Sequence, residues 1–130
     1  PMPNVSDIMD RDPVTVSPDT DVKSLIEVLQ KNELPGVPVV DADNKVLGIV
    51  TDSDLVISDE EADFHLPHYV NIMGGIVFEH LVTVGPDEPA EHAARKISEK
   101  HHNRLPVVDG DGKLVGVVTR VDVLAALTGD

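Results

Sequence analysis

Apolar residues in the first part of the chain follow a clear helical spacing. Four of them recur three or four residues apart: Val22, Leu25, Ile26 and Leu29. This spacing places them on one face of a helix and predicts an amphipathic helix that packs against a sheet. Pro18 suits the first turn of that helix, because the N–H group it lacks would have had no partner there.

Short β-branched runs surround this predicted helix. Val37–Val40 and Val46–Val50 flank the polar stretch Asp41–Lys45, which predicts a two-stranded hairpin. The turn of the hairpin needs a residue that tolerates positive φ, and Asn44 is placed to take it. A shorter run, Val14–Val16, predicts a strand before the helix.

The whole pattern occurs twice. A shift of 68 residues lays Val14–Leu55 on Val82–Val123 without a gap, and 15 of the 42 positions are identical. The counterpart of Asn44 is Gly112, as a turn with positive φ requires. One unit of strand, helix, two strands and helix would leave one face of its sheet uncovered. We therefore predict an α+β fold of two β-α-β-β-α units that pack sheet to sheet about a pseudo-twofold axis.

Composition narrows the function classes. The 130 residues include 24 acidic and 10 basic ones, for a net charge of −14, with one Tyr, two Phe, no Trp and no Cys. This charge repels nucleic-acid phosphates, and few aromatic rings could stack on bases. The lack of cysteine excludes disulfides and thiolate chemistry and fits a reducing compartment. Because no apolar stretch could span a membrane, we expect a cytoplasmic protein with no nucleic-acid or membrane partner.

One repeated motif is a candidate ligand-binding site. Each closing strand ends in a threonine followed three residues later by an aspartate, Thr51 with Asp54 and Thr119 with Asp122. A phosphate would suit the backbone N–H groups of a helix that starts there, and the carboxylate would suit a ribose diol. The alternative is a structural capping box. Residues 1–65 carry net charge −11 and residues 66–130 carry −3, so an anion meets less repulsion on the second half.

These motifs in this order resemble a pair of CBS domains, the regulatory modules of the cystathionine β-synthase type. The resemblance rests on the Pro-Val-Val-Asp runs, on both Thr-x-x-Asp motifs and on the leading segment Asp7–Pro13. It divides the chain into CBS unit 1 (residues 1–57), an inter-unit linker (58–81) and CBS unit 2 (82–130). It implies a protein that is not an enzyme, needs no cofactor and forms a homodimer. Such a protein binds AMP, ADP, ATP or S-adenosylmethionine in clefts between the units and regulates a partner protein.

The resemblance also implies which residues line each cleft. In the first cleft, Thr119 and Arg120 would meet phosphate, Asp122 would meet the ribose, and apolar and backbone groups would meet the adenine. The residues of this cleft are Ile8, Asp12, Pro13, Leu34, Pro35, Gly36, Val37, Thr119, Arg120, Val121 and Asp122. A second cleft would use Thr51, Ser53, Asp54, His102, Asn103, Arg104 and Leu105. Asp52 stands there in the place of Arg120, which makes the first cleft the better phosphate site.

Two further observations leave alternatives open. The second unit lacks its own Asp-Ile-Met leading segment, and Gly75–Leu81 stands there instead, which puts the adenine side of the second cleft in doubt. Histidines offer a metal alternative, at His65 and His68 near Asp63 and at the His101–His102 pair, but their spacing does not favour one ion and we predict no metal site. Other function hypotheses are a structural dimerisation module with vestigial clefts and a metal-dependent enzyme.

Overall fold

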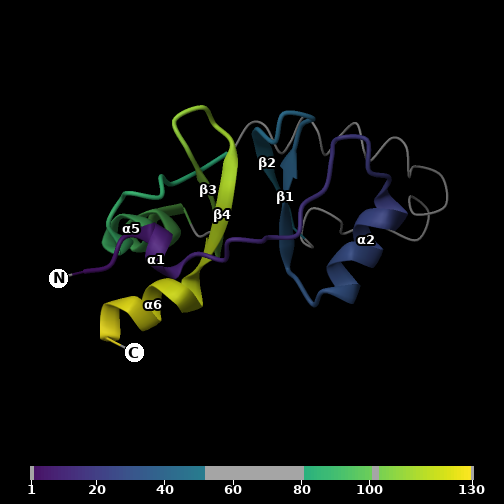
Figure 1. The fold of residues 1–130 in the computed structure, drawn as a ribbon. Coiled ribbons are helices and arrows are strands. Elements are labelled where there is room, and N and C mark those ends of the chain that lie inside the picture. The colour runs from purple at the N-terminus through teal and green to yellow at the C-terminus, as the bar shows by residue number, and fades with distance from the viewer. Residues whose placement is uncertain (1, 52–80, 101–102, 130) are drawn as a thin grey trace. The chain divides into compact units, whose positions relative to one another are not determined.

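The structure is a computed structural model that describes residues 2–51, 81–100 and 103–129 (Figure 1). It divides the chain into two compact units. The β1–β2 unit comprises residues 14–43 and 47–81, and the β3–β4 unit comprises residues 1–13, 44–46 and 82–130. The described elements are α1 (Val5–Ile8), α2 (Val22–Lys31), β1 (Gly36–Val40), β2 (Val46–Thr51), α5 (Ala90–Lys100), β3 (Arg104–Val108), β4 (Leu114–Thr119) and α6 (Arg120–Thr128).

The predicted repeat is confirmed for the first helix and the hairpin of each unit, whereas the predicted helix after Thr51 lies outside the described residues. The shift of 68 residues that aligns the two halves of the sequence carries the start of α2 to the start of α5, and β1 and β2 to β3 and β4. The short runs before the helices do not form the predicted strands. Each makes a single parallel bridge instead, Val16 to Val39 and Val84 to Val107.

The β1–β2 unit packs α2 against its hairpin (Figure 1). The helix starts at Val22 because the carboxylate of Asp21 accepts the Ser24 N–H, at 2.7 Å, and so caps it. We predicted from the sequence that Pro18 lies in the first turn of the helix, but Pro18 precedes the helix. It lies in a turn closed by the Thr20 N–H and Ser17 O. The core of this unit consists of Val16, Leu25, Leu29, Val37, Val39 and Val50.

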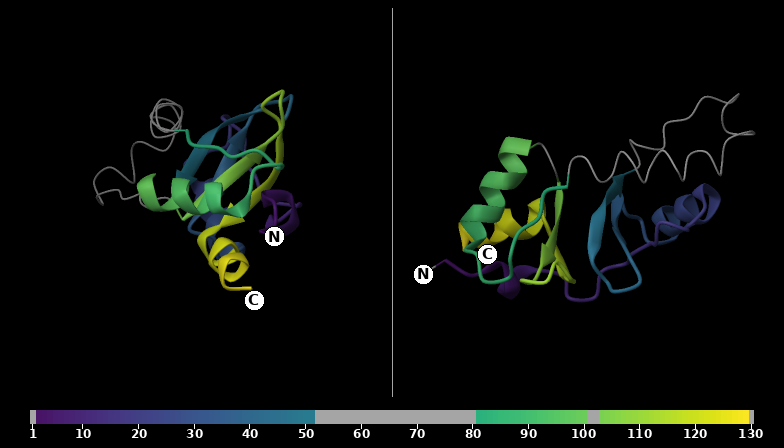
Figure 2. Two further views of the ribbon diagram at one scale, coloured as in Figure 1. Left: turned by 90° about the vertical axis from the view of Figure 1, so that its left-hand side faces the viewer. Right: turned by 90° about the horizontal axis from the view of Figure 1, so that it is seen from above.

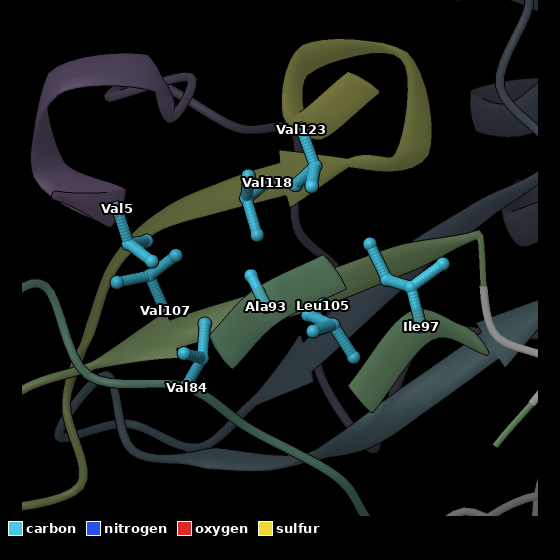
Figure 3. Close-up of a cluster of buried hydrophobic side chains, with 8 residues drawn as sticks. All are labelled: Val5, Val84, Ala93, Ile97, Leu105, Val107, Val118 and Val123. Carbon is cyan, nitrogen blue, oxygen red and sulfur yellow. The ribbon is translucent and has the colours of Figure 1, made fainter. Parts of the chain in front are cut away.

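The β3–β4 unit is built on an antiparallel hairpin in which Arg104 pairs with Thr119 and Val107 pairs with Gly116. Helices α5 and α6 lie on the same side of this hairpin (Figure 2). Gly112 has φ of 81° in its turn and Asn44 has φ of 65°, as predicted for both. The buried core of this unit, drawn in Figure 3, consists of Val5, Val84, Ala93, Ile97, Leu105, Val107, Val118 and Val123.

The N-terminal segment belongs to the β3–β4 unit. Val5 of α1 is wholly buried in the core of that unit (Figure 3), and its N–H donates to Glu88 O at 2.8 Å. Asp10 exchanges two backbone hydrogen bonds with Val117 of β4, at 2.8 and 2.9 Å. The leading segment and β4 approach each other closely here: a Cβ built on Gly116 would lie 2.7 Å from Asp10 O. The leading segment and the second repeat therefore fold as one body.

The turn before α5 is held by a carboxylate. Glu88 accepts the Gly85 N–H, and its Oε1 lies 3.4 Å from His92 Nδ1 and 3.7 Å from Lys96 Nζ. The lysine also donates to Thr83 O at 2.7 Å, which ties the helix to the segment before it. Burial acts to raise the pKa of Glu88, but the Gly85 N–H and the neighbouring Lys96 and His92 hold it below its usual value.

Within the part of the chain that the structure describes, no helix is both long enough and apolar enough to cross a membrane.

Candidate functional site

The junction of β4 and α6 forms the reciprocal cap that the Thr-x-x-Asp spacing predicted as one alternative. Thr119 is the N-cap residue of α6, and its Oγ1 accepts the Asp122 N–H at 3.2 Å. In return, the Thr119 N–H donates to Asp122 Oδ2 at 3.1 Å. The capping box therefore exists, and it holds the Asp122 carboxylate in a defined position at the end of the strand.

The cap leaves polar groups that a ligand could use. Oδ2 of Asp122 is committed to the cap, so Oδ1 is the oxygen that can accept from a hydroxyl. Thr119 Oγ1 accepts within the cap, and its hydroxyl hydrogen can still donate. The side chain of Arg120 is exposed to solvent beside both residues. The junction thus combines a diol acceptor, a hydroxyl donor and a cation.

The backbone contributes less to this junction than the sequence argument assumed. We expected the first N–H groups of the helix to be open to a phosphate. Instead, the Arg120 N–H donates to Asn103 O at 2.8 Å, and the Asp122 N–H is bound by Thr119. A phosphate here would therefore rely mainly on side chains.

Arg104 is the site residue whose surroundings the sequence analysis missed. We grouped it with the Thr51 cleft, but in its own unit it pairs across the hairpin with Thr119. Its side chain is half-buried, and this burial lowers the pKa of its guanidinium, while the nearby Asp10 and Asp122 act to raise it. The signal was present in the hairpin register, since the first residue of β3 must lie beside the last residue of β4.

We predicted that the leading segment comes from the unit opposite Thr119, but it lies in the same compact unit as this junction. Helix α1 contacts both β4 and α6, and Ile8 packs against the core of the unit. Asp12 is exposed, with its N–H donating to Asp10 Oδ1 at 3.0 Å, and Pro13 is half-buried.

Residues 34–37 of the first predicted cleft belong to the β1–β2 unit. Val37 is 1% exposed and Leu34 packs against the core of that unit, so both side chains already take part in the packing of that core. Gly36 is also closely surrounded, since a Cβ on it would lie 3.0 Å from Val50 O. These residues could offer a ligand mainly backbone groups, and their part in the cleft stays a prediction.

The second predicted cleft is described only in part. Thr51 ends β2 and is half-buried, Asn103 is exposed, and Leu105 is wholly buried in the core of the β3–β4 unit. Ser53, Asp54 and His102 lie outside the described residues, as do the other candidate metal ligands Asp63, His65, His68 and His101. The described residues contain no group of three or more His, Cys, Asp or Glu side chains that could hold a metal ion.

Comparison with known proteins agrees with the motifs. The family model of the CBS domain matches residues 5–60 and 73–129. Protein MJ1426 of Methanocaldococcus jannaschii is 28% identical over 95% of this chain and 90% of its own length. Inosine-5'-monophosphate dehydrogenase of Aquifex aeolicus is 36% identical over 86% of this chain, which spans only 22% of that enzyme.

Two solved structures show the same fold with bound ligands. The CBS domain pair of protein MJ0100, in complex with 5'-methylthioadenosine and S-adenosyl-L-methionine, has a TM-score of 0.79 and 27% identity, with 99% of this chain and 98% of that chain covered. CBSX2 of Arabidopsis thaliana, in complex with AMP, has a TM-score of 0.75 and 31% identity, with 97% and 96% covered. With both repeats matched by the family model and the fold shared with these pairs, this chain belongs to the CBS domain family and is a tandem CBS pair.

Proposed function

We propose that this CBS pair is a regulatory module that binds an adenosine-containing ligand at the β4–α6 junction. The observation that carries the proposal is the capping box of Thr119 and Asp122, which holds one carboxylate oxygen ready for a ribose hydroxyl. Exposed Arg120 and half-buried Arg104 place positive charge beside it, where a chain of net charge −14 needs it to attract phosphate. The structures of related pairs with AMP and with S-adenosylmethionine support the ligand class.

The proposal has further parts that follow from the family. The ligand would be AMP, ADP, ATP or S-adenosylmethionine, and its binding would change the activity of a partner protein in the cytoplasm. The chain itself would not be an enzyme, because both of its repeats are CBS domains. It would act as a homodimer.

A thermal-shift titration tests the ligand. AMP, ATP and S-adenosylmethionine are added separately to the full chain while the melting temperature is followed. A ligand at 100 times its Kd stabilises the folded state by about 2.7 kcal/mol, which for a domain of this size raises the melting temperature by about 10 °C. We expect such a shift with at least one of the three ligands. If none of them shifts the melting temperature, the proposal fails.

A pair of matched variants locates the site. Asp122→Asn keeps an oxygen that can cap α6 but removes the carboxylate from the junction, and we expect at least tenfold weaker binding. Asp111→Asn makes the same charge change in the turn between β3 and β4, at the other end of the hairpin from Thr119, and should bind as the wild type does. If Asp122→Asn binds as tightly as Asp111→Asn, the ligand binds elsewhere.

The second candidate function is a structural dimerisation module, and the exposed apolar face of α6 favours it. It predicts melting curves that do not respond to any adenosyl ligand. It also predicts a dimer that persists when Thr119 and Asp122 are both replaced by alanine. Ligand titration and measurement of the oligomeric state therefore separate the two functions.

A further inference from the structure

The sulfur of Met9 lies in the contact between the leading segment and β4. Met9 is the C-cap residue of α1, and its half-buried side chain packs against the core of the β3–β4 unit. A Cβ built on Gly116 would lie 2.6 Å from Met9 Sδ and 2.9 Å from Met9 Cγ. Gly116 is buried, so the thioether covers this glycine and leaves no room for a further atom between them.

Two backbone hydrogen bonds border this contact and hold the leading segment on β4. The Asp10 N–H donates to Val117 O at 2.8 Å, and the Val117 N–H donates to Asp10 O at 2.9 Å. Asp10 and Val117 directly follow Met9 and Gly116 in the chain. A change that drives the sulfur away from the glycine therefore acts on the neighbouring hydrogen-bonded pair.

Sulfur occurs in this chain only as thioether, because the sequence contains three methionines and no cysteine. Met2 is exposed and Met9 is half-buried, while Met73 lies outside the described residues. The repeat does not duplicate the position of Met9, since the shift of 68 residues carries it to Val77. Partial exposure gives a small oxidant access to Met9, and its contact with Gly116 gives oxidation a structural consequence.

We propose that Met9 is a site of reversible oxidation, at which conversion to methionine sulfoxide releases the leading segment from β4. The thioether sulfur attacks one oxygen of hydrogen peroxide and the O–O bond breaks. The second oxygen takes up the proton of the transferred one and leaves as water. Sulfur is thereby oxidised by two electrons and the peroxide is reduced. The product is polar where the thioether was apolar, and a methionine sulfoxide reductase can restore it.

The sulfoxide cannot keep the place of the thioether. The contact over Gly116 has no room for an added oxygen. That oxygen needs a hydrogen-bond donor or water, and the nearby Val117 N–H already donates to Asp10 O. The oxidised side chain therefore turns out to solvent, which uncovers Gly116 and admits water to the hydrogen bonds between Asp10 and Val117.

Peroxide treatment of the full chain without ligand tests the proposal. Met9→Leu keeps an apolar side chain of similar volume but cannot form a sulfoxide, and Met2→Leu is the matched control at an exposed methionine. Peptide mass spectrometry should find one added oxygen on Met9. Treatment should lower the melting temperature of the wild type and of Met2→Leu by at least about 5 °C, and should leave that of Met9→Leu unchanged.

Hydrogen exchange shows where the oxidised protein opens. The amides of Asp10 and Val117 should exchange at least about tenfold faster after oxidation, and a sulfoxide reductase should reverse the change. The Val108 amide, which donates to Val84 O at 2.9 Å in the same unit, should exchange as before. A Met9 that stays unoxidised while Met2 is oxidised would overturn the proposal. So would unchanged exchange at Asp10 and Val117, or an equal fall in melting temperature for Met9→Leu.

A consequence for the ligand site rests on the proposed function. Asp10 lies close to the Arg104 guanidinium, which is also near Asp122, so release of the leading segment changes the charges beside the cap of α6. The oxidised wild type should therefore bind AMP more weakly than peroxide-treated Met9→Leu, and equal affinity would contradict this consequence. If AMP binds neither protein, the failure belongs to the ligand proposal, since hydrogen exchange is measured without ligand and decides the oxidation proposal separately.

Discussion

Replacing Gly116 by alanine tests the contact between the leading segment and the second repeat. An added Cβ would lie 2.6 Å from Met9 Sδ and 2.7 Å from Asp10 O. The methionine side chain can turn away, but the carbonyl is backbone and is held by its hydrogen bond from the Val117 N–H, at 2.9 Å. Relief of the clash therefore requires the leading segment to move away from β4.

The expected cost follows from what this movement breaks. Two hydrogen bonds join Asp10 and Val117, and each contributes about 0.5–1.5 kcal/mol. Overpacking by one methyl group costs about 1–3 kcal/mol. We therefore expect Gly116→Ala to lower the free energy of unfolding by about 2 kcal/mol, which corresponds to a melting temperature lower by roughly 8 °C.

A matched glycine provides the control. Gly110 lies in the hairpin turn of the same unit, and a Cβ built on it meets no atom within 4 Å. Urea unfolding should show little or no loss of stability for Gly110→Ala. If the two variants unfold at the same urea concentration, the leading segment is not pinned against β4. Met9→Ala combined with Gly116→Ala should recover only part of the loss, since the Asp10 carbonyl still clashes.

Two other predictions concern the same unit. Val5→Ala should lower the free energy of unfolding by about 2 kcal/mol, because it removes buried methyl groups from the core; a urea midpoint equal to that of the wild type would contradict the assignment of α1 to this core. The Glu88→Gln variant should lose less stability than the wild type when the pH is lowered. The folded-state pKa of Glu88 is below its ordinary value of 4.5, so its stabilising contribution is present above that pH and is lost as pH falls through the lower value. The difference in urea stability between pH 7 and pH 3.5 measures this effect, and an equal difference in the variant and the wild type would refute it.

The sequence predicted the local features of the fold well. Hairpins, the helix at Val22 and the positive φ values at Asn44 and Gly112 depend on residues close together in the chain, and all were confirmed. The predicted helix start at Pro18 was wrong because the Asp21 carboxylate is a better N-cap than the preceding turn.

Features that depend on distant residues were harder to predict. Nothing in the pattern around Val5 indicates that it fills the core of the second repeat, since the contact joins residues about eighty positions apart. The cap at Thr119 was predicted from its spacing, but the Asn103 carbonyl that occupies the Arg120 N–H was not. The proximity of Arg104 to Asp10 depends on the same docking of the leading segment, whereas its proximity to Asp122 follows from the hairpin register.

Because the leading segment completes the second repeat, the two halves of the sequence cannot be separated by a single cut. A fragment that starts at residue 82 would lack Val5 and would leave a gap in its core. It would also leave the edge of β4 that pairs with Asp10 open to other strands, a known route to aggregation. A stable fragment would need residues 1–13 supplied in trans or joined behind residue 129, as in a circular permutation.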